Sequence, residues 1–94
     1  MTLHWTPDAL EDLDEAGAYV AEYHPRAARR MAERVLEAVE GLVEFPNLGR
    51  TGRVRTTREL VVSGTPFLVI YRARLDELQV IRVLHHARRW PPQR

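Results

Sequence analysis

The sequence predicts an α+β fold in which an N-terminal antiparallel helical hairpin packs on a three- to four-stranded antiparallel sheet. Apolar residues recur at helical spacing in the first half of the chain, whereas the second half contains short apolar blocks separated by turn residues. A chain of 94 residues has room for one core. We therefore expect a single domain over residues 1–94, with the hairpin at about 7–44, a loop at 45–53, the sheet at about 54–86 and a tail at 87–94.

Two helices are predicted to form the hairpin. The first begins at Thr6 and Pro7, because threonine is a favourable N-cap and proline fits the first helical position. A break at residues 23–25 restarts the chain at Pro25, and the second helix then carries apolar residues at alternating spacings of three and four up to Val43. A connection this short makes the two helices fold back on each other.

Three strands are predicted to follow, at residues 54–63, 67–74 and 78–84. Gly64, Thr65 and Pro66 form the first turn, and Asp76 and Glu77 the second. Short connections make neighbouring strands antiparallel. Residues 3–5 are a candidate additional edge strand.

The charges of the chain are strongly polarised. Residues 1–47 contain ten Asp and Glu against four Arg, a net charge of −6, whereas residues 48–94 contain three Asp and Glu against ten Arg, a net charge of +7. Like charges gathered in one half repel one another, and an acidic partner would relieve that repulsion. The basic half is therefore the expected working surface.

Several classes of protein do not fit this composition. Without cysteine, the chain has no disulfide framework, thiol nucleophile or thiolate metal site. His85 and His86 lack a third ligand at suitable spacing, so we expect neither a metal nor another cofactor. No signal peptide or membrane-spanning stretch is visible, and a cytoplasmic protein is the expectation.

Several segments, taken together and in this order, carry a family resemblance: residues 5–9, 19–21, 45–50, 57–62, 67–72 and 83–91. Their order and spacing resemble those of the RelE/ParE family of bacterial toxins from type II toxin–antitoxin modules. The resemblance spans nearly the whole chain. It implies a growth-inhibiting toxin, of the kind linked to plasmid stabilisation, that a cognate antitoxin holds inactive. Operator DNA would then be bound only indirectly, through the antitoxin. We expect the antitoxin to lay an extended or helical segment across the apolar helices and the basic sheet.

The family divides by target into a branch that cleaves mRNA on the ribosome and a branch that poisons DNA gyrase. The mRNA-cleaving members have an Arg on the strand that corresponds to residues 67–71, where this chain has Leu68. For cleavage, Glu59 is the candidate base, His85 or His86 the candidate acid, and Arg58, Arg82 or Arg88 the candidate phosphate ligands. Side chains alternate along a strand, so only one of the two histidines shares a face with Glu59.

Leu68 differs from the pattern of the mRNA-cleaving branch, and segments 58–62 and 85–91 resemble those of members without nuclease function. Both observations favour the gyrase-poison branch, with no catalytic residue. The candidates for binding the target or the antitoxin are basic or aromatic, and they are Arg53, Arg55, Arg58, Arg72, Arg82, Arg88, Arg89 and Trp90. Purely structural roles compete with these assignments: Arg58 and Glu59 also suit a surface ion pair, and Trp90 also suits a cover for the sheet. A plain nucleic-acid-binding module is a third hypothesis.

Overall fold

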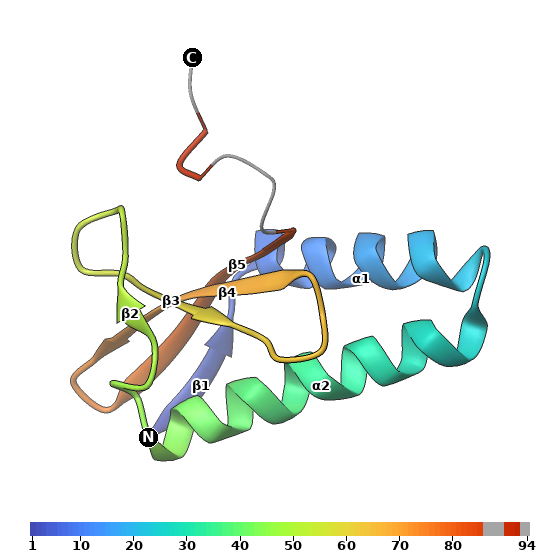
Figure 1. Cartoon of the computed structure of the whole chain (residues 1–94). Coiled ribbons are helices and arrows are strands. Elements are labelled where there is room, and N and C mark those ends of the chain that lie inside the picture. Colours follow the sequence, from blue (N-terminus) through green and yellow to red (C-terminus); the bar gives the residue numbers. More distant parts are fainter. Residues whose placement is uncertain (86–89, 93–94) are drawn as a thin grey trace.

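The structure, a computed structural model, describes residues 1–85 and 90–92. Strand β1 (Thr2–Trp5) precedes the helices α1 (Pro7–Ala21) and α2 (Pro25–Glu44). The strands β2 (Arg50–Thr51), β3 (Arg58–Val61), β4 (Phe67–Arg74) and β5 (Glu77–His85) follow. Both helices lie on one side of the sheet, and the tip of their hairpin projects beyond it (Figure 1). The predicted α+β class and helical hairpin are confirmed.

The predicted number of strands is wrong, because the described part of the chain forms a five-stranded sheet in the order β1-β5-β4-β3-β2. The candidate edge strand at residues 3–5 is real, but it pairs parallel with β5, so that Leu3 lies opposite Leu78 and Trp5 opposite Val80. Strand β2 lies inside the predicted loop 45–53 and pairs antiparallel with β3. Two residues are too few to show a periodic pattern, and the partner of β1 lies at the other end of the chain. The rule that short connections make neighbouring strands antiparallel could therefore predict neither the pairing of β1 with β5 nor that of β2 with β3.

The signals that predicted the helix starts act as expected. The Thr6 side chain accepts a hydrogen bond from the Ala9 N–H at 3.1 Å, and Pro7 occupies the first turn of α1. Pro25 does the same for α2. Four apolar positions of α2, Ala28, Val35, Val39 and Leu42, are buried, and Met31 and Val43 are partly buried.

The sheet carries a different apolar cluster on each face. On the face towards the helices, α1 and α2 contribute Ala9, Val35, Val39 and Leu42, the strands contribute Phe67, Val69, Tyr71, Leu78, Val80 and Val83, and Val62 adds to them from just after β3. The face away from the helices carries a smaller cluster, formed by Leu68, Ile70 and Leu84 with Ile81 and Trp90 packed against it. We call this smaller cluster the outer patch. Alternation along β4 explains the division, since successive side chains point to opposite faces.

Helix α1 completes the free edge of β5 beyond the end of β1. The Thr6 hydroxyl donates to the Ile81 carbonyl at 2.7 Å, and the Val83 N–H donates to Asp12 Oδ2 at 3.0 Å. The ladder between β4 and β5 shifts register between Ile70 and Tyr71, a bulge-like irregularity. Next to this shift, Arg82 Nε and Nη2 donate to the two oxygens of Asp12 at 2.7 and 2.8 Å. These hydrogen bonds raise the pKa of Arg82 above its ordinary value.

Tyr71 fixes the segment between α2 and β2. Its hydroxyl donates to the Pro46 carbonyl at 2.7 Å and accepts from the Gly49 N–H at 2.9 Å. A Cβ at position 49 would lie 2.7 Å from the Tyr71 ring and hydroxyl, so the close approach requires glycine. One buried side chain on β4 therefore holds the chain where it enters β2.

We predict that Asp12→Asn lowers the free energy of unfolding by about 2–4 kcal/mol, because it removes the carboxylate that compensates Arg82. Urea denaturation at neutral pH measures the change. Asp14→Asn is the matched control, since Asp14 is exposed on the same helix. Equal effects of the two substitutions would show that the ion pair contributes nothing.

We also predict that Tyr71→Phe lowers the free energy of unfolding by about 1–2 kcal/mol, because it leaves the Pro46 carbonyl and the Gly49 N–H without this partner. Burial raises the pKa of Tyr71, and this exceeds the opposing effects of the Gly49 hydrogen bond and the Arg58 charge. The tyrosine then contributes stability that is fully present below its unfolded pKa of about 10 and is lost as the pH rises through the raised folded value. Urea titrations at neutral and alkaline pH, with exposed Tyr23→Phe as the control, test both statements.

Candidate functional site

The loop between β2 and β3 carries much of the positive charge that the sequence analysis singled out. Hydrogen bonds from Gly52 N–H to the Thr57 carbonyl at 2.8 Å and from the Thr57 hydroxyl to the Val54 carbonyl at 2.6 Å fold residues 52–57 into a tight turn. Thr56 lies in the left-handed region, with φ of 69°. Its hydroxyl accepts a hydrogen bond from Arg72 Nε at 3.0 Å, which ties β4 to the loop.

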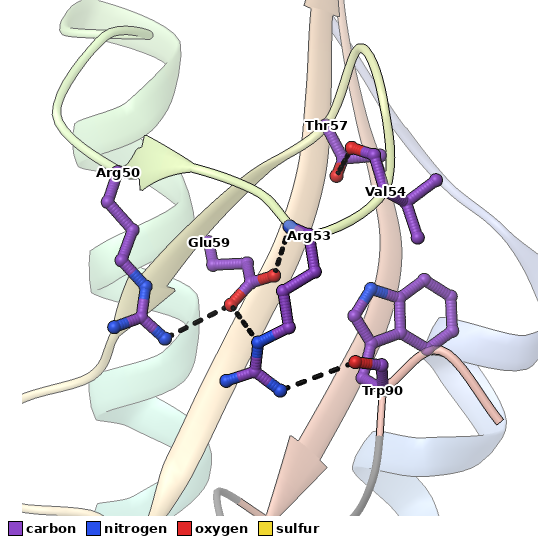
Figure 2. A network of polar contacts seen from close by, with 6 residues as sticks. All are labelled: Arg50, Arg53, Val54, Thr57, Glu59 and Trp90. Carbon is purple, nitrogen blue, oxygen red and sulfur yellow. Dashed lines mark hydrogen bonds and ion pairs between the residues drawn. The ribbon is translucent and has the colours of Figure 1, made fainter. Parts of the chain in front are cut away.

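Glu59 lies beneath this loop, and its carboxylate binds two of the nearby arginines. Its side chain has no exposed surface, yet Arg50 Nη2 donates to Oε1 at 3.1 Å and the Arg53 N–H donates to Oε2 at 2.9 Å. Arg53 Nε lies 3.7 Å from Oε1. Figure 2 shows both arginines converging on this one carboxylate. A general base needs a free oxygen within reach of its substrate, and this geometry does not offer one.

The other nuclease candidates do not gather around Glu59. His85 pairs with Phe67 across the β4–β5 ladder, and the two rings are 6.1 Å apart on the face towards the helices. Glu59 pairs with Ile70, which belongs to the outer patch on the opposite face. His86 and Arg88 lie outside the described residues.

Leu68 is the residue that the sequence analysis took as a departure from the mRNA-cleaving pattern. It is buried in the outer patch beside Ile70 and Leu84, with Trp90 packed over them. A phosphate group has no cationic partner at this position, because apolar side chains fill it. Position 68 therefore belongs to the apolar packing of the sheet.

The predicted cationic binding residues divide into groups. Arg53, Arg55 and Arg72 lie in or beside the β2–β3 loop, next to Arg50 of β2, which was not among the predicted binding residues. Arg58 pairs with Tyr71 on the face towards the helices and donates to the Gly49 carbonyl at 2.8 Å. Arg82 is engaged by Asp12 and is mostly buried, so its charge is already compensated. Arg89, like Arg88, lies outside the described residues.

Trp90 contacts both the outer patch and the loop between β2 and β3. Its ring packs against the outer patch, and its carbonyl accepts a hydrogen bond from Arg53 Nη1 at 3.3 Å. The loop cations and Trp90 thus form one surface over buried Glu59, on the side of the sheet away from the helices. We call this the loop surface; it comprises Arg50, Arg53, Arg55, Arg72 and Trp90.

A second feature is an apolar groove of about 460 Å³ that the sequence analysis missed. It runs between α1, α2 and the ends of β4 and β5, and it is lined by Ala16, Tyr19, Val20, Met31, Phe67, Val83 and Leu84 with Asp12, Glu15 and His85. Tyr19 is 69% exposed beside it. The only signal in the sequence was an apolar stripe on α1, which the hairpin alone explained.

Two further features are absent from the described ranges. Residues 1–85 and 90–92 contain no group of three or more His, Cys, Asp or Glu placed to hold a metal ion. Neither described helix is long and apolar enough to cross a membrane.

Comparison with known proteins identifies the family. The family model of the ParE toxin of the type II toxin–antitoxin system parDE matches residues 3–90. The putative toxin Y4kP of Sinorhizobium fredii is 42% identical over 89 residues, which is 95% of this chain and 92% of that protein. Toxin RelE2 of Caulobacter vibrioides is 38% identical over 84 residues, covering 89% of this chain and 93% of the relative.

A solved structure agrees with these relatives. A chain of the chromosomal ParDE toxin–antitoxin system from P. aeruginosa superposes with a TM-score of 0.80 at 29% sequence identity, covering 88% of this chain and 92% of that one. The family model matches nearly the whole of the present chain, and the shared fold has two helices packed on a mostly antiparallel sheet. The chain therefore belongs to the ParE toxin family of type II toxin–antitoxin systems.

Proposed function

We propose that this toxin stops bacterial growth in the cytoplasm by binding DNA gyrase through the loop surface, without chemistry of its own. The environment of Leu68 and Glu59 carries this proposal. Leu68 is buried in the outer patch, and Glu59 is enclosed by two arginines, so the groups that RNA cleavage requires are not assembled among the described residues. The loop surface instead offers cations beside a half-buried tryptophan, a combination common at the centres of protein interfaces.

The loop surface retains charge for an acidic partner. Arg55 and Arg72 contact no carboxylate among the described residues, and Arg50 and Arg53 share the single charge of Glu59. Both arginine side chains at Glu59 remain more than half exposed, at 59% and 51%. Acidic groups on a protein target would therefore meet accessible guanidinium groups, which bind carboxylates in a planar, paired geometry.

The antitoxin is the second proposed partner, and the apolar groove suits one of its segments. The groove is lined mostly by apolar side chains together with exposed Glu15, which matches an amphipathic helix with a basic flank. Exposed Tyr19 offers the large aromatic contact typical of such grooves. A segment bound here would lie next to the end of β5.

We predict that the purified protein inhibits supercoiling by gyrase, and that Arg72→Ala weakens this inhibition about fivefold or more, since it removes a loop-surface cation. Arg29→Ala is the control, because Arg29 is an exposed cation on α2, away from the loop surface. A translation extract containing mRNA is assayed in parallel. Cleavage of message with no effect on gyrase would replace the proposal with the endonuclease function.

For the antitoxin, we predict that Tyr19→Ala weakens its binding by about tenfold or more, which is typical for truncating an aromatic anchor. Calorimetry with the product of the neighbouring antitoxin gene measures this. Tyr23→Ala is a matched control, because Tyr23 is equally exposed, contacts Tyr19 edge-to-face at 6.0 Å and does not line the groove. Similar losses for the two variants would rule out the groove as the specific site.

A further inference from the structure

Glu59 holds Arg53 at two points. One oxygen accepts the Arg53 main-chain N–H at 2.9 Å, and the other lies 3.7 Å from the Arg53 Nε. Because the carboxylate is fully buried on β3, it is a fixed reference in the sheet. The main chain and the side chain of Arg53 are therefore both set by one group.

Arg53 uses the far end of its guanidinium for a second contact. Nη1 donates to the Trp90 carbonyl at 3.3 Å, so the planar group lies between Glu59 and Trp90 (Figure 2). A guanidinium presents several donors in a rigid fork and spans two acceptors, whereas an ammonium is a single point of charge. The chain of contacts runs from the sheet through Arg53 to the tail.

The bond from Arg53 is the only hydrogen bond that Trp90 forms in the described part of the molecule. Its indole nitrogen is buried and has no hydrogen-bond partner among the described residues. Its ring packs on the outer patch, where Ile70 is the cross-strand neighbour of Glu59. This packing holds the ring, whereas the Arg53 hydrogen bond holds the main-chain carbonyl of Trp90 and so fixes where the residue lies over the patch.

We infer that Glu59 is a positioning residue of the loop surface: acting through Arg53, it fixes Trp90 and two guanidinium groups in one arrangement that the target recognises. This inference rests on the proposed function, because it assigns Trp90 and the loop cations to target binding. It gives the buried carboxylate a role distinct from that of a catalytic base. Under this inference, a positive charge at position 53 is not enough to hold Trp90. The side chain must also contact Glu59 and the Trp90 carbonyl at once, which the forked guanidinium of arginine allows.

The first experiment uses Arg53→Lys, which keeps the charge and removes the fork. The chain has two tryptophans, so Trp5→Phe leaves Trp90 as the only fluorescent indole. In this background, Arg53→Lys is expected to shift Trp90 emission to longer wavelength and to increase its quenching by acrylamide up to about fivefold, the effect of losing one surface contact. Arg55→Lys is the matched control, since it makes the same exchange in the same loop at an exposed residue that forms no hydrogen bond or ion pair with Glu59 or Trp90.

The inference predicts that Arg53→Lys also weakens gyrase inhibition by at least the factor seen in the quenching. Unchanged Trp90 emission relative to Arg55→Lys would overturn the inference, and so would altered emission with full inhibition. If the unmodified protein does not inhibit gyrase, the proposed function fails, and the emission data alone then decide whether Arg53 positions Trp90.

A second variant tests the role of Glu59 itself. Glu59→Gln in the Trp5→Phe background is expected to reproduce the emission shift of Arg53→Lys. Combining Glu59→Gln with Arg53→Lys should add no further shift, because both act along the same chain of contacts. Additive shifts would place Glu59 and Arg53 on separate paths and contradict the inference. Circular dichroism of each variant establishes that it is folded.

Discussion

The buried carboxylate of Glu59 is the constraint on which the basic side of this molecule depends. A carboxylate without exposed surface has lost its hydration, so donors within the protein have to compensate its charge. Arg50 and Arg53 supply those donors from a segment that would otherwise be loop. The contacts that compensate the charge of Glu59 therefore also join β2 to β3. They set the positions of Arg50 and Arg53 in the loop surface.

A second buried carboxylate acts in the same way at the opposite side of the sheet. Asp12 binds Arg82 through two hydrogen bonds and also accepts the Val83 N–H, so it fastens α1 to β5. The helix thereby satisfies an edge that would otherwise expose unpaired backbone groups. These two carboxylates hold Arg50, Arg53 and Arg82 in place, whereas Arg55 and Arg72 contact no carboxylate among the described residues.

This division of charge bears on how a ParE-family toxin engages its partners. The apolar groove beside α1 and the loop surface beyond β2 are separate features, one lined mostly by apolar side chains and the other basic with an aromatic residue. Under the proposed function, apolar contacts would recognise the antitoxin at the groove, and charge contacts would recognise the target at the loop surface. The internal contacts of Arg53 and Arg82 show that the count of positive charges overstates what is available for binding.

The sequence by itself determined the fold class, the helical hairpin and the central strands, because helix caps, apolar periodicity and turn residues act over a few neighbouring positions. Thr6, Pro7 and Pro25 begin their helices as local chemistry dictates, and the 67–74 strand lies where its apolar run predicted. Tertiary structure decided the parallel pairing of β1 with β5, the two-residue strand β2 and the partners of Asp12 and Glu59. Those contacts join residues far apart in the chain, and the geometry of the packed sheet selects them from many chemically equivalent pairs.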